Sequence, residues 1–281
     1  MKKTNVKLNY LYNLAFQLFA LVTPLITTPY VARVLTSGGT GKYTFAASLN
    51  SYFVMAAALG FSFHAQREIA KQQGNIEKQS VIFWEIFVCK ISAGIVSFVL
   101  LWTLILCGVF GEYTILMEIM SIEVFSTSIN IAFFFQGNEK FGLIAARDFI
   151  VKIVGIILIF CFVRTQNDLW IYALCHTGAA LASVLTLWPC VRKLIVPIKV
   201  SQLRPIRHIG PSLTLFIPTI AISIFTILDK TLIGILIPGQ VEVILKDGTV
   251  VQQKVADIEN GYYGQSEKII KMAMTVLASL G

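Results

Sequence analysis

Charged residues are scarce in this sequence: 14% of its 281 residues are Asp, Glu, Lys or Arg, whereas 56% are hydrophobic. The mean hydropathy is +0.74, which excludes a water-exposed globular protein, because such a surface needs more polar side chains. A helix that crosses the hydrocarbon core of a bilayer needs about 20 apolar residues. The sequence therefore predicts an integral membrane protein if its apolar runs are that long.

Charge-free runs of this length recur along the chain. Five long runs cover residues 8–32, 43–66, 91–111, 169–191 and 208–228. Three further segments carry some charge: 113–135 with Glu118 and Glu123, 143–163 with Arg147, Asp148 and Lys152, and an eighth from about Gln265 to Gly281. We therefore expect an all-α polytopic bundle of eight membrane helices.

The sequence also lacks the motifs of common catalytic sites. It has no Gly-rich phosphate loop, HExxH motif or nucleophile elbow, and its three histidines are scattered. Its five cysteines lie in or beside apolar runs, without the spacing of a metal site or a disulfide framework. We therefore expect no enzyme activity, no catalytic residues, no cofactor and no metal site.

The positive charges are distributed unevenly between the two ends of the predicted helices. With the N-terminus in the cytoplasm, fourteen cations from Lys2 to Arg207 fall on the inner side, and five fall outside, namely Arg33, Lys42, Arg164, Lys246 and Lys254. Cytoplasmic loops are enriched in Lys and Arg, so this count predicts a cytoplasmic N-terminus. It also explains the net charge of +8 without nucleic acid as a partner.

An internal similarity divides the chain. Residues 41–60 resemble residues 261–281, which places similar sequences in the second and eighth predicted helices. A period of six helices preserves orientation, as in transporters built from two parallel lobes, although two apolar helices can also look alike by chance. We expect a six-helix lobe at residues 1–193, a basic cytoplasmic linker at 194–207 and the start of a second lobe at 208–281. Alternating apolar and polar residues at 241–259 predict an external β-hairpin.

Charges within apolar helices are candidate functional residues, because each costs about 2.5 to 3.5 kcal/mol at mid-helix. Four cations could line a substrate cavity: Arg33, Lys90, Arg147 and Lys230. Two acids, Asp229 and Glu123, could couple transport to an ion. For Arg33, Arg147 and the pair Asp229–Lys230, anchoring at the membrane surface is the alternative.

Local geometry refines these candidates. Asp148 and Lys152 are spaced i,i+4 and can pair, which would leave Arg147 available to grip a diphosphate. Glu85 and Lys90 lie about 140° apart around a helix and cannot pair directly, so we expect Glu85 near the membrane surface and Lys90 in the lumen. Pro24 and Pro29 could kink the first helix toward a gate.

Several stretches resemble the polysaccharide-unit flippases of the multidrug/oligosaccharidyl-lipid/polysaccharide superfamily, which export O-antigen, capsule and teichoic-type glycans. They are TTPYVARVL (27–35), GKYTFAASLNSYF (41–53), QREIA (66–70), FFFQGNEKFGLIAARDFIVKI (133–153), LDKTLIG (228–234) and GYYGQSEKII (261–270). Members of this group usually have twelve to fourteen helices in two lobes, so the resemblance implies that this chain is truncated.

The resemblance implies a flippase of the bacterial cytoplasmic membrane that translocates an undecaprenyl-diphosphate-linked oligosaccharide by alternating access, driven by a proton or sodium gradient. Its partners would be this lipid-linked glycan, membrane lipids, and a polysaccharide polymerase with other assembly proteins. The alternatives are a drug antiporter of the same superfamily, for which we would expect carboxylates in place of cations, or a non-functional fragment. A membrane-bound polymerase or ligase would need a large outer loop, which is absent from the sequence.

Overall fold

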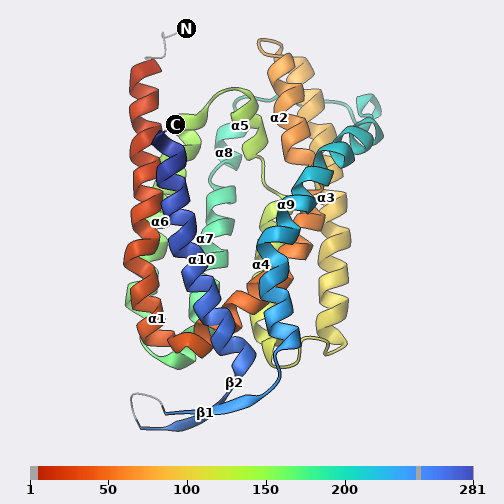
Figure 1. Ribbon diagram of the computed structural model, residues 1–281. Helices are drawn as coiled ribbons and strands as arrows, with labels where there is room; N and C mark the ends of the chain where they lie inside the picture. Colours follow the sequence, from red (N-terminus) through yellow and green to blue (C-terminus); the bar gives the residue numbers. More distant parts are fainter. Residues whose placement is uncertain (1–5, 245–247, 281) are drawn as a thin grey trace.

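Figure 1 shows the computed structural model, which describes residues 6–244 and 248–280. Lys2, Lys3, Lys246 and Gly281, which enter the predictions above, lie outside these residues. The helices are α1 (Val6–Ala58), α2 (Phe61–Lys71), α3 (Ile76–Leu106), η1 (Gly111–Tyr113), α4 (Thr114–Ser128), α5 (Ala132–Gly137), α6 (Phe141–Phe162), η2 (Gln166–Asp168), α7 (Leu169–Leu185), α8 (Trp188–Val191), η3 (Val200–Gln202), η4 (Pro205–His208), α9 (Ile209–Leu236) and α10 (Val255–Leu280).

Helix α1 contains two membrane-length segments joined at a sharp bend. Thr36 has φ 62° and ψ 176°, which interrupts the helix between residues 6–35 and residues 37–58. The Thr36 hydroxyl donates to the Leu35 carbonyl at 2.6 Å, and the Thr40 hydroxyl donates to the Thr36 carbonyl at 2.9 Å. These bonds satisfy carbonyls near the bend. The interruption lies seven residues beyond Pro29, so the recorded break is not at the predicted proline positions.

A second break separates α1 from α2. Leu59 and Gly60 both have positive φ, 39° and 70°. Helix α2 begins directly after them, at Phe61 (Figure 1). A Cβ at position 60 would press on the Ser212 carbonyl of α9. Glycine is therefore required here both by the backbone conformation and by the close approach of α9.

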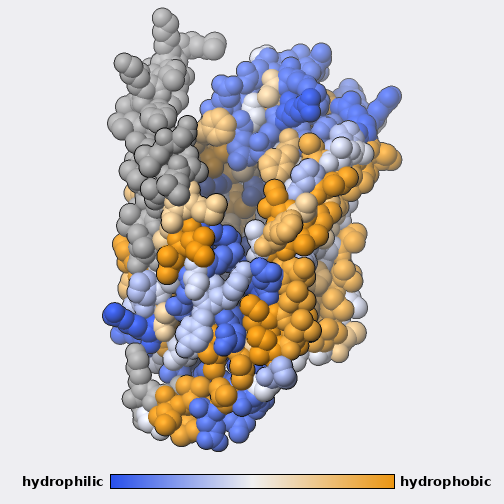
Figure 2. All heavy atoms as spheres, in the orientation of Figure 1, coloured by the Kyte–Doolittle hydropathy of each residue, from blue (hydrophilic) through white to orange (hydrophobic). Residues whose placement is uncertain are grey.

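Among the residues that the structure describes with their side chains, five helical stretches are long and apolar enough to cross a membrane: Ile26–Lys71, Ile76–Leu106, Gly111–Gly137, Gln166–Val191 and Pro205–Leu236. The helices α6 and α10 have 22 and 26 residues but carry more charge. Large apolar side chains cover the outside, for example Val96 at 69% and Phe225 at 81% exposure, and Figure 2 shows this apolar surface. Such a surface is stable only against lipid or apolar protein.

An aromatic cluster fixes one end of the bundle. Phe83 of α3 packs against Phe133 and Phe134 of α5, with ring centroids 5.8 Å and 5.5 Å away. All three rings are at most 2% exposed. Phe87 of α3 also stacks edge-on against Trp188 of α8 at 5.1 Å. This cluster explains why the FFF sequence before the QGNEKF motif is buried, and it holds α5 against α3.

A β-hairpin projects from the opposite end (Figure 1). Strand β1 (Gln240–Ile244) pairs antiparallel with β2 (Val250–Lys254), with Gln240 opposite Lys254. The chain then enters α10 directly at Val255. The predicted hairpin segment, 241–259, therefore extends five residues too far, and the last helix starts about ten residues earlier than expected. Ala256, Asp257 and Asn260 are at most 2% exposed, so packing rather than apolar composition determines this helical turn.

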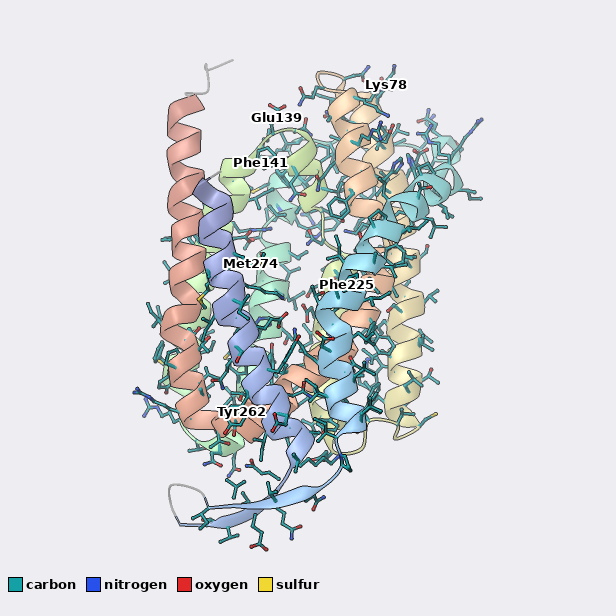
Figure 3. The ribbon with its side chains drawn as sticks, in the orientation of Figure 1. Lys78, Glu139, Phe141, Phe225, Tyr262 and Met274 are labelled. Atoms are coloured by element: carbon teal, nitrogen blue, oxygen red, sulfur yellow. The ribbon has the colours of Figure 1, made fainter. Side chains whose placement is uncertain are left out.

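The described chain ends lie together at one end of the bundle, away from the hairpin (Figure 1). The first segment of α1 and helix α10 run side by side, whereas α2, α3 and α9 form the other side of the view. Lys78 and Glu139 lie at the end that carries the chain ends (Figure 3). We call this the terminal end, and the opposite one the hairpin end.

Candidate substrate-binding site

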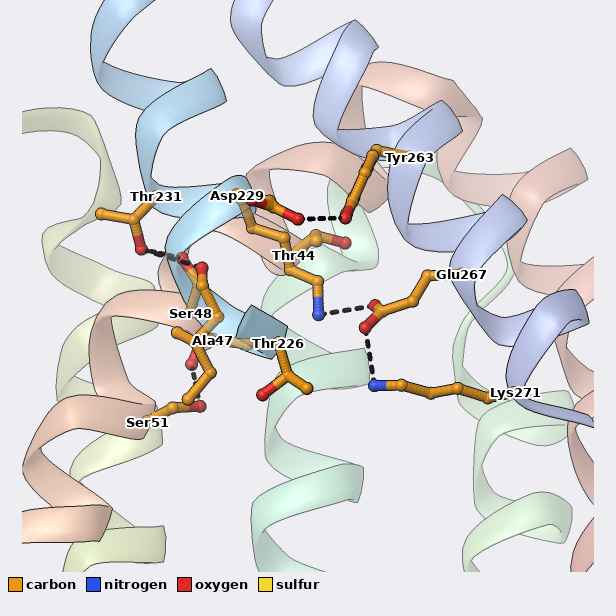
Figure 4. A network of polar contacts seen from close by, with 12 residues as sticks. Thr44, Ala47, Ser48, Ser51, Thr226, Asp229, Thr231, Tyr263, Glu267 and Lys271 are labelled. Atoms are coloured by element: carbon orange, nitrogen blue, oxygen red, sulfur yellow. Dashed lines mark hydrogen bonds and ion pairs between the residues drawn. The ribbon is translucent and has the colours of Figure 1, made fainter. Parts of the chain in front are cut away.

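The two helices of the chain's C-terminal part face each other through a network of charges, drawn in Figure 4. The Lys230 ammonium of α9 lies 2.6 Å from a carboxylate oxygen of Glu267 on α10, and the other oxygen lies 2.6 Å from Lys271. The Lys230 and Glu267 side chains are only 16% and 19% exposed. Each charge thus has a partner in a poorly hydrated position, which offsets the cost of placing it there.

The neighbouring acid extends this network. Asp229 accepts a hydrogen bond of 2.6 Å from the Tyr263 hydroxyl. Tyr263 and Glu267 are four residues apart and so lie on one face of α10, where consecutive residues of α9 reach both of them. We call Asp229, Lys230, Tyr263, Glu267 and Lys271 the α9–α10 network.

A hydroxyl cluster fastens α9 to the second segment of α1. Thr231 is 8% exposed, lies 3.2 Å from the Tyr52 hydroxyl and bonds to the Ser48 hydroxyl at 3.1 Å. A Cβ at Gly234 would overlap the Phe45 ring, so α9 lies in close contact with α1 here. These contacts fix the direction in which the adjacent Asp229 and Lys230 point.

A small polar pocket lies between α1, α7 and α10. Its volume is about 20 Å³, enough for a water molecule. Its lining includes Thr40 and Tyr43 of α1, Tyr172 of α7, and Gln265 and Lys268 of α10. Hydroxyl, amide and ammonium groups of this kind bind sugar hydroxyls and phosphate oxygens. The α9–α10 network and this pocket share helix α10, and together they form the candidate site.

Beyond the site, side chains close the hairpin end. Glu112 of η1 bridges Lys42 of α1 and Lys254 of β2, with both ammonium groups 2.6 Å from its oxygens. The Tyr113 hydroxyl donates to Asp257 of α10 at 2.9 Å. We call these five residues the hairpin clamp. By contrast, Figure 2 shows a hollow toward the terminal end, beside the side formed by α2 and α9.

The structure disperses the four predicted cations. Arg33 is exposed on α1, three residues before the bend. Lys90 is 1% exposed and donates to the Asn130 carbonyl at 2.6 Å, with the Phe133 ring centroid 5.3 Å away. It is therefore held in the aromatic cluster of α3 and α5. Lys230 alone of the four belongs to the α9–α10 network.

Arg147 is not available in the way its spacing predicts. Its guanidinium donates to Asp148 at 2.7 Å and to the Ser183 carbonyl of α7 at 2.7 Å. The prediction that Arg147 would be left unpaired is therefore wrong. Arg147 reaches the carboxylate of its neighbour Asp148 because the Ser183 carbonyl of α7 is a second acceptor that orients the guanidinium.

The predicted acids also have specific partners. Glu123 of α4 accepts a 3.2 Å hydrogen bond from the Asn50 amide of α1, and Asp229 bonds to Tyr263. Glu85 is 1% exposed and bonds to His208 at 2.8 Å, and its position near the membrane surface stays a prediction. The sequence reasoning missed Glu267 and Lys271, although their i,i+4 spacing on an apolar helix was a signal of a stabilised charge pair.

Apolar helices that expose apolar side chains outward and join charges inward define an all-α polytopic membrane protein. The sequence profile of the polysaccharide biosynthesis protein family matches residues 6–280, and the chain belongs to this family.

The chain is also similar to a curated protein of Escherichia coli (strain K12) named "Putative O-antigen transporter". The two are 25% identical over 227 residues, which cover 80% of this chain and 55% of the relative. The chain thus spans about half the length of the relative. No solved structure matches the chain significantly.

Proposed function

We propose that this chain forms part of a flippase that moves an undecaprenyl-diphosphate-linked oligosaccharide across the bacterial cytoplasmic membrane. The observation that carries the proposal is the α9–α10 network, in which the largely buried Lys230 and the exposed Lys271 flank the single carboxylate of Glu267. Family membership and the similarity to an O-antigen transporter support the same class of substrate.

The chemistry of such a substrate matches the candidate site. A diphosphate and sugars cannot enter hydrocarbon without replacements for their hydration, whereas the polyprenyl tail can stay in lipid. Ammonium groups bind phosphate oxygens, and the hydroxyls of Thr40, Tyr43 and Tyr172 would replace water around sugars once movement of α10 away from α1 widens their pocket. Because Glu267 also binds Lys271, its carboxylate does not fully neutralise Lys230, and an arriving anion can compete for Lys230.

The closed hairpin end and the hollow at the terminal end support an alternating-access cycle. With the N-terminus in the cytoplasm, as the positive-inside rule favours, the hollow faces the cytoplasm and the hairpin clamp closes the outer side. This arrangement corresponds to a state that loads substrate from the cytoplasmic leaflet. Release would require the clamp to separate, with residues 1–193 moving against residues 208–281 around the linker at 194–207. The polymerase that extends the glycan would act after this step.

Substitution in the chromosomal gene tests the proposal. Lys230→Gln and Lys268→Gln each remove one positive charge from the candidate site, and we expect surface glycan to fall at least about tenfold as lipid-linked precursor accumulates. Lys193→Gln removes an exposed charge far from the site and should leave glycan unchanged. Membrane levels of each variant are measured by immunoblot.

Normal glycan in both site variants, at normal protein levels, would rule out the proposed cation site. A change in resistance to cationic drugs with unchanged glycan would favour the antiporter alternative instead.

A further inference from the structure

A second polar cavity lies away from the candidate site, between α2, α3 and the start of α9. Its volume is about 530 Å³, within the range of ligand pockets, and its lining includes His64, Lys78, Arg207, His208 and Pro211. Lys78 lies at the terminal end of the molecule (Figure 3). The α9–α10 network contributes no residue to this cavity.

The cavity carries excess positive charge. Lys78 and Arg207 line it from different elements, the start of α3 and η4. The acid among the lining residues, Glu68, already lies 2.7 Å from Lys71. An anion that enters therefore meets Lys78 and the side of Arg207 that faces away from its partner Glu85, while Glu68 is compensated by Lys71.

Behind Arg207, the cavity wall is formed by the Glu85 carboxylate and the groups that donate hydrogen bonds to it. Glu85 accepts from the Arg204 backbone amide at 2.7 Å and from the Arg207 Nε at 3.1 Å, and His208 Nε2 lies 2.8 Å away. A guanidinium has five N–H donors, so binding Glu85 through Nε and Nη2 leaves further donors on Arg207 that can reach a ligand.

The two histidines have defined roles in this wall. A carboxylate only accepts hydrogen bonds, so His208 Nε2 carries a proton and donates it to Glu85. His208 Nδ1 and His64 Nε2 lie 2.8 Å apart and share a second hydrogen bond. This chain links α2 to η4 and to α3, and it fixes the cavity wall whether or not a ligand is bound.

Exposed apolar residues are close in sequence to the residues that line the cavity. Phe63 precedes His64 and is 57% exposed, Ile206 precedes Arg207 and is 80% exposed, and Leu213 follows Pro211 and is 46% exposed. A soluble anion needs no such surroundings. Acyl chains do, and cationic pockets between membrane helices bind the headgroups of anionic lipids.

We propose that this cavity binds the phosphate of an anionic phospholipid between Lys78 and Arg207, with the acyl chains along the exposed apolar residues of α2 and α9. The bound phosphate ties α3 to η4, and so holds the segment after the linker against the first six-helix region. The proposal does not depend on the glycan substrate proposed above.

Lipid binding to the purified chain tests this. Phosphatidylglycerol and phosphatidylcholine with identical acyl chains are added in detergent, and bound lipid is measured by native mass spectrometry. We expect preferential retention of phosphatidylglycerol, and about fivefold weaker binding by Lys78→Gln, since one lysine near a membrane surface contributes about that factor. Lys140→Gln, an exposed lysine elsewhere, is the matched control.

Charge reversal sharpens the comparison. Lys78→Glu should abolish the preference for phosphatidylglycerol, whereas Lys140→Glu should keep it. Equal binding of the two lipids, or equal loss in the Lys78 and Lys140 variants, would overturn the proposal. Inorganic phosphate that displaces phosphatidylglycerol at equal concentration would also overturn it, in favour of a soluble anion.

Discussion

At the scale of single residues, the structure shows how charges persist on apolar helices. Lys230 would be costly alone, but Glu267 reaches it from α10 and Lys271 reaches the same carboxylate from the next turn. Lys90 is stabilised differently, by a backbone carbonyl and an aromatic ring. The charges around Glu267 can exchange partners, whereas the buried charge of Lys90 holds α3 against the segment that contains Asn130 and Phe133.

Removing the shared carboxylate should destabilise the protein. Glu267→Gln leaves two ammonium groups facing a neutral amide, and we expect a loss of about 1–3 kcal/mol in stability. The melting temperature of the purified protein in detergent measures this loss.

The control for this substitution is on the same helix. Glu259→Gln also removes one acid from α10, but its side chain is exposed, so its melting temperature should stay close to that of the parent. If the two variants had the same melting temperature, the α9–α10 network would not contribute to the stability of the protein.

At the scale of elements, helices α1 and α10 come into backbone contact near the hairpin end. A Cβ at Gly41 would overlap the Asp257 carbonyl, and one at Gly261 would overlap the Ser37 carbonyl. Small residues permit such close approach of membrane helices. This contact and the hairpin clamp occupy the same end, which is why that end is closed.

Gly41→Ala should therefore separate α1 from α10. An added methyl group in a fully packed contact costs about 1–3 kcal/mol, and we expect a lower melting temperature in detergent. Gly178→Ala provides the comparison, because a Cβ there meets nothing within 4 Å. It should be neutral or stabilising, since alanine favours the helix. A drop of the same size in both variants would show that the contact does not limit stability.

The elements were largely predictable from charge-free runs, because only long apolar segments satisfy a bilayer. The start of α10 was not predictable, since the alternation of apolar and polar residues continues to Glu259 and made residues 255–259 look like part of the hairpin. The Asp257 and Asn260 side chains are fully buried in the structure, so tertiary packing overrides composition there. The candidate site was predictable only in part. The free-energy cost of a charged side chain within an apolar helix identified Asp229 and Lys230 as candidates. Their partners depend on how α9 crosses α10, which the sequence does not give.

At the scale of the whole molecule, the hairpin clamp joins parts that the proposed cycle must separate. Glu112 holds Lys42 of α1 and Lys254 of β2 at the same time, so one carboxylate connects α1 to the strand before α10. Permanent closure of this end should stop transport if the substrate leaves there.

A covalent bridge across the clamp tests this requirement. The paired substitution Lys42→Cys with Lys254→Cys is made in the chromosomal gene, with the five native cysteines replaced by alanine or serine. A membrane-impermeant bis-maleimide is added to cells, and new surface glycan is measured. We expect cross-linking from outside, because the clamp is at the predicted outer face, and loss of glycan synthesis in proportion to the bridged fraction.

A second cysteine pair distinguishes the effect of closing the hairpin end from damage by the cross-linking reagent. Lys42→Cys with Glu112→Cys places the bridge at the same end but within the first six-helix region, so it should form without stopping transport. The two pairs share residue 42, but the second also removes the Glu112 carboxylate, so each variant is compared with itself before the cross-linker is added. Continued glycan export with residues 42 and 254 fully bridged would mean that the hairpin end does not open during transport, and the alternating movement would have to occur elsewhere.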